Sequence, residues 1–340
     1  MIYQEILENA RKRVGPYCNA CPVCDGRGCG NRIPGPGAKG LGTGFKRNYD
    51  KWQTLCLNMD TICQSGPADT SRTFFGTTLS LPVFAAPVGA MKLHYGDLYD
   101  DLAYNDILLP ACRDAGIAAF TGDGTNPAVM ESAASALGNC GGCGIPTIKP
   151  WDMETIRHKM DLVKAAEPIA IAMDIDAAGL PFLKKRQPPA GSKTVEELRE
   201  IAAMAERPFI LKGIMTVRGA EKALSAGAAG IVVSNHGGRV LDQCPATAEV
   251  LPAIADAVGD RMTVLVDGGI RTGMDVFKAL ALGAHAVLIG RPFVTMVYGG
   301  GAEGVGVYVE KLRAELEDTM AMCGASSLRD IRRSMIFGME

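Results

Sequence analysis

The stretch "GIVVSNHGGR" (230–239) ends an apolar run in residue types that can do chemistry. Its polar members are Ser234, Asn235, His236 and Arg239. A histidine can take up a proton near neutral pH, and an arginine can hold a carboxylate through paired hydrogen bonds. Gly237 and Gly238 remove the side chains that would crowd these groups. An isolated histidine is more often structural, but this setting predicts a ligand site.

Two further turns combine glycine with arginine, "DGGIRTG" (267–273) and "IGRP" (289–292). Glycine-rich backbone can approach a phosphate closely, and Arg271 and Arg291 carry the opposite charge. The alternative is that the glycines only form tight turns and the arginines lie in water. The pattern favours a phosphorylated cofactor or substrate.

Eight short apolar runs, each followed by a polar or glycine-rich turn, must position these groups. They are "PVFAAPVGA" (82–90), "GIAAFTGDG" (116–124), "GIPTIK" (144–149), "PIAIAMDID" (168–176), "PFILKGI" (208–214), "GIVVSNHGG" (230–238), "TVLVDGG" (263–269) and "AVLIGRP" (286–292). Such runs are typical of parallel strands buried on both faces. Segments with helical periodicity lie between them, for example 194–206, 216–227 and 272–284. This alternation predicts an α/β fold, a (β/α)8 TIM barrel, with a doubly wound open sheet as the alternative.

The first 80 residues do not follow this alternation. They are rich in Gly and Cys, and "RIPGPGAKGLGTG" (32–44) indicates irregular chain. We expect an irregular N-terminal Cys/Gly-rich cap segment over residues 1–80 and a ligand-binding barrel over residues 81–340. The stretch "KKRQPPAGSK" (184–193) predicts a long loop after the fourth strand, in a position where barrels often carry a lid.

Polar residues gather at the ends of the predicted strands. They are Thr121, Asp123, Lys149, Asp174, Asp176, Lys212, His236, Arg239, Asp267, Arg271 and Arg291. Because the carboxyl ends of barrel strands meet at one face, we expect these side chains to converge there.

The composition limits the classes of function that the protein can have. The net charge of -2 and the pI of about 6.1 give no field that favours nucleic acid or an anionic membrane surface. No stretch has the apolar length of a membrane span, and the N-terminus does not resemble a secretion signal. We therefore expect a cytoplasmic protein that acts on a small molecule, without nucleic acid or membrane partners. A homo-oligomer is a separate expectation.

Eleven cysteines are many for such a protein, and seven of them lie before Ala118. In "YCNACPVCDGRGC" the spacing is C-x2-C-x2-C-x4-C, formed by Cys18, Cys21, Cys24 and Cys29. This run partly resembles a bacterial ferredoxin motif but lacks the final Cys-Pro. Three interpretations remain open: an iron–sulfur cluster, a structural zinc, and plain thiols. Cys140 and Cys143, which we expect near the barrel mouth, could supply ligands or a redox pair instead.

Four motifs together resemble the FMN-dependent 2-hydroxy-acid oxidase and dehydrogenase family, which includes glycolate and lactate oxidases. They are "LKGI" (211–214), "SNHGGRVLD" (234–242), "DGGIRTGMDVFKALALGA" (267–284) and "IGRP" (289–292). The similarity is close from about residue 209 to 292, looser between 85 and 176, and weak over the first 45 residues. "KRNYDKW" (46–52) resembles the family's motif at the entry to the barrel.

The resemblance implies roles for four residues. Lys212 stabilises the reduced flavin, His236 accepts the proton, Asp174 orients His236, and Arg239 binds the substrate carboxylate. It also implies FMN contacts from Ala86, Pro87, Val88, Thr121, Lys212, Ser234, Asp267, Gly269, Arg271, Gly290 and Arg291. Oxidation of a hydroxy acid requires a neutral base, an anion clamp and an electron sink, which His236, Arg239 and FMN supply.

Three departures from the family concern the substrate. The N-terminal tyrosine of the family is replaced near Asn31, and the tyrosine after strand three falls at Ile148 or Lys149. The second carboxylate-binding arginine is replaced by Pro181. Lys149 could therefore contact substrate and bind a different anionic group, and His94, after strand one, could also touch it. The sequence leaves the electron acceptor open.

Two other functions remain as alternatives. One is an FMN-dependent isomerase similar to type 2 isopentenyl diphosphate isomerase, against which "SNHGGR" argues. The other is a flavin- and cysteine-based redox sensor or electron-transfer protein. A sensor has no need for a base beside an anion clamp, so the oxidoreductase is favoured.

Overall fold

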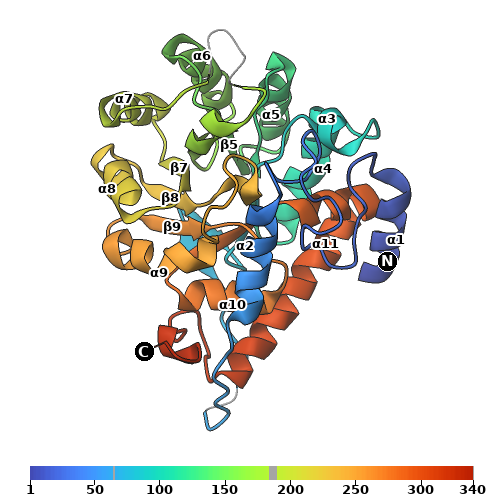
Figure 1. The fold of residues 1–340 in the computed structure, drawn as a ribbon, viewed down its shortest axis with the longest axis vertical. Helices are drawn as coiled ribbons and strands as arrows, with labels where there is room; N and C mark the ends of the chain where they lie inside the picture. The colour runs from blue at the N-terminus through green and yellow to red at the C-terminus, as the bar shows by residue number, and fades with distance from the viewer. Residues whose placement is uncertain (64–65, 184–189, 340) are drawn as a thin grey trace.

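Eight parallel strands at the centre of the molecule close into a barrel with helices around it (Figure 1). This computed structural model describes residues 1–63, 66–183 and 190–339. The strands, in chain order, are β3 (Val83–Ala85), β4 (Ala118–Thr121), β5 (Gly144–Ile148), β6 (Ile171–Asp174), β7 (Phe209–Ile214), β8 (Gly230–Val233), β9 (Thr263–Val266) and β10 (Ala286–Ile289). Leu288 of β10 pairs with Phe84 of β3, which closes the barrel. The predicted (β/α)8 class is confirmed, and the open sheet is wrong.

Helices follow each strand and cover the outside of the barrel. They are α3 (Met91–Tyr95), α4 (Asp101–Asp114), α5 (Pro127–Asn139), α6 (Met153–Lys164), α7 (Val195–Ala205), α8 (Val217–Ser225), α9 (Thr247–Val258), α10 (Gly273–Ala281) and α11 (Arg291–Met322). Several begin at a side chain that accepts a backbone N–H, for example Asp152 of α6, Thr194 of α7 and Thr272 of α10. Three short 3-10 helices are η1 (Ile175–Gly179), η2 (His236–Gly238) and η3 (Arg333–Met335).

One apolar side chain from each strand fills the interior of the barrel. These are Phe84, Phe120, Ile145, Ala172, Ile210, Val232, Leu265 and Leu288, in a cluster separate from the larger core between strands and helices. The rings of Phe84 and Phe120 meet edge to face with centroids 5.5 Å apart. Phe74, from the hairpin of β1 (Arg72–Phe74) and β2 (Thr77–Leu79), packs on Phe84 at 5.4 Å. The hairpin therefore closes the N-terminal end of the barrel.

The inward-facing side chains of the strands also form the floor of the C-terminal end of the barrel. Side chains alternate along a strand, so the residue two positions after each interior side chain points inward one layer higher. Those residues are Ala86, Gly122, Thr147, Asp174, Lys212, Ser234, Asp267 and Gly290. The interior layer is apolar, and the layer above it is polar or very small. The pleat of the strands thus brings these groups together at the C-terminal mouth.

The N-terminal segment is more regular than predicted and lies against the barrel. It contains α1 (Tyr3–Arg13), which packs on α11, and α2 (Thr43–Thr54), which lies by η2 (Figure 1). Trp52 of α2 donates its indole N–H to the carbonyl of Gly268, 2.8 Å away. Apolar residues at helical spacing are present in both helices. The glycines and cysteines of the stretch between them favoured the prediction of irregular chain for the whole segment. The domain boundary at residue 80 stays a prediction.

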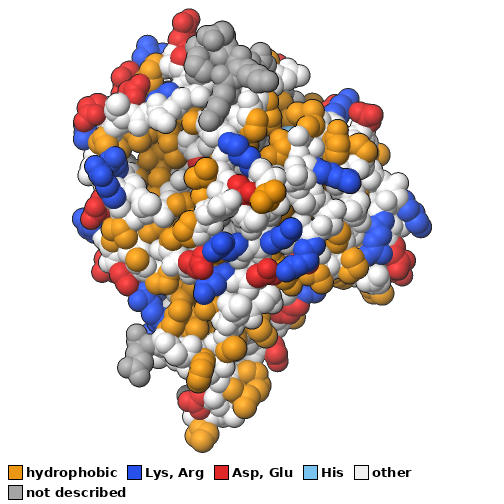
Figure 2. Space-filling view, in the orientation of Figure 1, with side chains coloured by type: hydrophobic (Ala, Val, Ile, Leu, Met, Phe, Trp, Pro, Cys, Tyr) orange, Lys and Arg blue, Asp and Glu red, His pale blue; other side chains and the backbone are white. Residues whose placement is uncertain are grey.

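Part of the proposed lid loop, residues 184–189, lies outside the described residues. Within the described ranges, no helix combines the length and apolar character needed to cross a membrane. Basic and acidic side chains are interspersed over the face shown in Figure 2.

We expect Phe120→Ala to lower the free energy of unfolding by about 3–5 kcal/mol, because it removes a fully buried ring between Phe84 and the strands beside it. Urea unfolding followed by circular dichroism measures this. Phe337→Ala is the matched control, since that ring is 74% exposed. Equal losses in both variants would show that the interior layer does not stabilise the barrel.

Candidate functional site

A cavity opens at the C-terminal mouth of the barrel, where most of the polar strand ends converge. Its charged lining residues are Asp123, Lys149, Asp174, Lys212, Arg239, Asp267, Arg271 and Arg291, and His236 also lines it. Cations outnumber carboxylates, which favours an anionic ligand. Ala86, Pro87, Val88, Gly269 and Gly290 line it as well. Thr121, Ser234 and Asp176 are not lining residues, and they lie buried or half-buried beside it.

One side of the cavity combines glycine backbone with two arginines. Gly269 has a φ of 85°, and a Cβ there would meet the Asn48 carbonyl at 2.4 Å, so only glycine fits. Arg271 donates from Nε to the Cys24 carbonyl at 2.8 Å, while its buried Nη2 has no partner within the described residues. Arg291 lies 3.7 Å above the Phe45 ring and opens α11. A helix N-terminus beside two guanidinium groups suits a phosphate.

A buried ion pair forms the floor of the cavity. Lys212 donates from Nζ to Asp174 Oδ1 at 3.0 Å and lies 3.7 Å from Asp267 Oδ2. Lys149 Nζ reaches the other oxygen of Asp174 at 3.3 Å. The pair is adjacent in register on β6 and β7, so the sheet itself sets its position. Burial opposes the charge on Lys212, but Asp174, Asp176 and Asp267 outweigh it and raise the Lys212 pKa.

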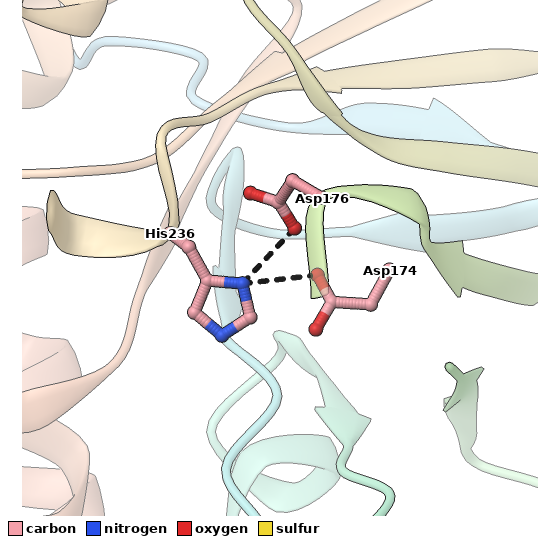
Figure 3. A group of neighbouring side chains, drawn as sticks. All are labelled: Asp174, Asp176 and His236. Carbon is pink, nitrogen blue, oxygen red and sulfur yellow. Dashed lines mark hydrogen bonds and ion pairs between the residues drawn. The ribbon is translucent and has the colours of Figure 1, made fainter. Parts of the chain in front are cut away.

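Two carboxyl groups face the same ring nitrogen of His236, as Figure 3 shows. Its Nδ1 is 3.0 Å from Asp176 Oδ1 and 3.4 Å from Asp174 Oδ1. An N–H at Nδ1 can donate to these oxygens, which leaves the Nε2 lone pair free for a substrate. Asp174 stood alone as the predicted partner, and Asp176 is the nearer one. The only sequence signal for it was the second carboxylate in "DID".

The two carboxyl groups respond oppositely to their surroundings. Burial disfavours charge on Asp174, yet His236, Lys212 and Lys149 outweigh it and hold the Asp174 pKa well below its usual value. Burial and the charge of Asp174 raise the pKa of Asp176 well above its usual value. The two groups therefore titrate as a coupled pair, in which Asp174 loses its proton before Asp176 does.

The imidazole of His236 is neutral in this setting. Burial lowers its pKa well below the usual value, and Lys212 lowers it further, although Asp174 acts in the opposite direction. Lys149 and Arg239 also lower it. A neutral imidazole is the form that can accept a proton.

Arg239 is fixed by the N-terminal segment. Its Nη1 donates to the carbonyls of Gly35 and Gly37, at 2.5 and 2.8 Å. Burial, together with the charge of Arg291, lowers its pKa to about 10, so it stays charged at neutral pH. Gly35 and Pro36 themselves line the cavity, which the sequence did not reveal.

The remaining wall carries apolar side chains, and two of the three predicted substrate departures lie outside it. Leu93, Leu180 and Phe182 line the cavity, whereas Asn31 and Pro181 are exposed and do not. Ile148 is fully buried, so Lys149 is the residue after β5 that reaches the site. His94 also lines the cavity, and its Nδ1 accepts the Gly35 N–H at 2.9 Å. Burial lowers the pKa of His94 to about 3, so its remaining proton lies on Nε2.

Asp174, Asp176 and His236 are also the one group, among the described residues, whose metal-ligand atoms lie within 4.8 Å of one another. Lys212 and Lys149 already compensate the carboxylate charge there. A bound cation would have to compete with both ammonium groups. The arrangement therefore suits a base and its partners better than a metal centre.

Cys140 and Cys143 form a disulfide, but their predicted place near the barrel mouth is wrong. They precede β5 and so lie at the N-terminal end of the barrel. Cys143 lines a second pocket there with Phe75 and Gly116. They are remote from the cavity because parallel strands separate the two ends.

Comparisons with known proteins agree with this geometry. The sequence profile described as FMN-dependent dehydrogenase matches residues 36–190 and 182–337. A peroxisomal (S)-2-hydroxy-acid oxidase of Oryza sativa subsp. japonica is 48% identical over 325 residues, which covers 86% of this chain and 87% of that protein. A 2-hydroxyacid oxidase of Dictyostelium discoideum is 47% identical over 146 residues, covering 43% of this chain and 38% of that protein. A solved mandelate oxidase variant with (S)-mandelic acid superposes with a TM-score of 0.79 at 28% identity, covering 98% of this chain and 97% of that one.

We expect His236 to remain neutral at about pH 5.5, one unit below the ordinary histidine pKa of about 6.5, because burial and Lys212 disfavour its charged form. NMR of protein with isotope-labelled histidine measures the protonation, and His236→Ala assigns the signal. A His236 signal that titrates near 6.5 would contradict the electrostatics derived above.

Proposed function

Because the chain belongs to the family of FMN-dependent 2-hydroxy-acid oxidases and dehydrogenases, we propose that it oxidises a 2-hydroxy acid to the 2-oxo acid in this cavity, with His236 as the base. The observation that supports this most directly is the neutral imidazole held between two carboxyl groups beside Arg239, in a cavity rich in cations.

The cavity residues fit FMN. Several buried polar atoms at the strand ends have no partner within the described residues: Thr121 Oγ1, Thr147 Oγ1, Asp267 Oδ1 and Arg271 Nη2. Buried polar groups are rarely left unpaired, so such a set indicates a polar ligand. We propose that Thr147 and Asp267 face the ring and ribityl groups, and that Arg271, Arg291, Gly269 and Gly290 hold the phosphate. Thr121 was predicted to contact FMN, but its side chain does not line the cavity. Bound FMN would supply the acceptor for the two electrons of the substrate.

Each nearby side chain has one task in this proposal. Lys212 places a fixed positive charge where the flavin ring carries negative charge after reduction. Arg239 and Lys149 hold the substrate carboxylate, and this orients the carbinol group toward His236. His236 takes up one proton at Nε2. Asp174 and Asp176 keep the ring in place through Nδ1 and stabilise the imidazolium that results.

The side chain of the substrate faces the apolar wall. Leu93, Leu180 and Phe182 line the cavity, and their side chains offer no partner for a second charge. We propose a 2-hydroxy acid with an aliphatic or aromatic side chain, larger than lactate. The cytoplasmic location and the homo-oligomer stay predictions, since nothing in the described chain bears on either.

An anaerobic screen of 2-hydroxy acids, followed by flavin absorbance, tests the reaction and the substrate class together. We expect bleaching with 2-hydroxyisocaproate or mandelate at lower concentration than with glycolate or lactate. Bleaching by none of these acids would overturn the proposed activity. A preference for glycolate would overturn only the role of the apolar wall.

We expect His236→Ala to keep its FMN but to reduce it about a hundredfold more slowly with the best substrate, the usual loss on removing a general base. Stopped-flow absorbance measures the rate. His158→Ala, which changes an exposed helical histidine, is the control. An unchanged rate in His236→Ala means that another group is the base.

We expect Arg271→Ala to weaken FMN binding about tenfold or more, because a charge-assisted hydrogen bond to the phosphate is lost. Binding of riboflavin, which has no phosphate, should not change. Fluorescence titration of flavin-free protein measures both. Arg313→Ala is the control, since Arg313 contacts Ser80 and Ala115 instead. Equal weakening for both flavins would place Arg271 away from the phosphate.

A further inference from the structure

The four-cysteine loop, residues 18–29, is the one predicted chemical motif that the proposed oxidation does not use. Its members Cys18, Cys21, Cys24 and Cys29 are all half-buried free thiols. The C-x2-C spacing of Cys18 and Cys21 is the same as that of Cys140 and Cys143. Only the second pair forms a disulfide.

Contacts from several elements fix the backbone of this loop. Asn19 donates from its side-chain amide to the Gly28 carbonyl at 3.3 Å, which joins the two ends of the motif. Arg11 of α1 donates to the Ala20 carbonyl at 3.1 Å, and Arg27 pairs with Asp50 of α2 at 2.9 Å. Arg271 holds the Cys24 carbonyl from the cavity side. The loop is therefore preorganised although it has no regular secondary structure.

Two local features position sulfurs of the loop. Ala20 has a φ of 41°, an uncommon conformation for a residue with a side chain, and its N–H donates to the Cys18 sulfur. A Cβ on Gly28 would lie 2.8 Å from the Cys21 sulfur, so this glycine leaves the space that the sulfur occupies. Backbone N–H donors to sulfur are a known feature of cluster ligation.

The separation of the sulfurs distinguishes between two metal centres. Four sulfurs around one zinc lie about 4 Å apart, because each zinc–sulfur bond is about 2.3 Å. Among the described residues, no three of these four thiols come within 4.8 Å of one another. A four-iron cluster keeps its cysteine sulfurs farther apart, since each binds a different corner of a cube. We propose that the four-cysteine loop binds a [4Fe–4S] cluster through its four thiolates.

The loop lies at the wall of the flavin cavity. The Cys24 carbonyl accepts a hydrogen bond from Arg271, which lines the cavity. A cluster here would be next to the group that accepts the substrate's electrons.

This position gives the cluster a role that rests on the proposed function. Oxidation of one 2-hydroxy acid breaks a C–H and an O–H bond, forms a C=O bond and releases two electrons and two protons. The cluster carries the electrons singly to a one-electron acceptor protein, two equivalents of which are reduced per substrate. The protons leave through His236 and solvent. The enzyme is then a dehydrogenase with a protein acceptor.

Metal analysis of the full-length protein, purified with FMN in the absence of oxygen, tests the site. We expect about four iron atoms and four acid-labile sulfides per chain, and an electron paramagnetic resonance signal after dithionite reduction. Both readouts are independent of substrate. One zinc per chain, iron without sulfide, or no metal after reconstitution with iron and sulfide would each overturn the proposal.

Two double variants make the test specific. Cys18→Ser with Cys24→Ser should lose iron and sulfide but keep FMN, whereas Cys140→Ser with Cys143→Ser should keep all three. Iron that persists in the first variant assigns the cluster elsewhere. If the first variant also loses FMN, Cys29→Ser, which changes only one proposed ligand, is used in its place. The iron and sulfide content of the unchanged protein tests the proposed cluster independently of both variants.

Reduction of cytochrome c by substrate tests the role in electron transfer. In Cys18→Ser with Cys24→Ser we expect this reduction to fall to background while anaerobic bleaching of the flavin continues at its normal rate. Undiminished cytochrome c reduction would overturn the role. If no substrate bleaches the flavin of the unchanged protein, the proposed function is wrong, whatever the iron content of that protein.

Discussion

The buried ion pair of Lys212 and Asp174 is the interaction on which the site depends. Two charges inside a barrel are tolerated only if further groups compensate them, and Lys149, Asp267 and His236 do so here. Each compensating group comes from a different strand end, so the network also ties the strands together. Loss of one member would leave a buried charge without its partner, which costs several kcal/mol.

The same network sets the protonation of the base. Burial is the main cause that lowers the His236 pKa, and positive charge from Lys212 and Lys149 lowers it further, whereas Asp174 favours the imidazolium. The balance keeps His236 neutral before reaction and still provides a carboxylate for the proton it gains. Burial and the charge of Asp174 raise the pKa of Asp176, which is nearer to Nδ1. One carboxylate thus compensates the cations while the other positions the ring.

The N-terminal segment completes the cavity and does not only cover it. Carbonyls of Cys24, Gly35 and Pro36 accept hydrogen bonds from Arg271, Arg239 and Arg291. These contacts hold the arginine side chains, which are otherwise long and flexible, in one orientation. Little conformational entropy is therefore lost when a ligand binds. The segment that carries the four-cysteine loop is therefore the same one that orients the anion-binding side chains.

Local pattern determined the strands, the barrel and the convergence of the polar strand ends. The apolar runs and the turns that follow them, "SNHGGR", "DGGIRTG" and "IGRP", can be recognised from neighbouring residues alone. The pleat of the strands then brings the turn residues to the C-terminal end of the barrel. The helices α1 and α2 were missed because Gly and Cys dominate the composition around them. What only the tertiary structure decided are contacts between segments distant in the chain: Asp176 beside His236, Gly35 against Arg239, and Phe182 in the substrate wall. Packing of segments 60 to more than 200 residues apart sets these contacts, and no local periodicity encodes it.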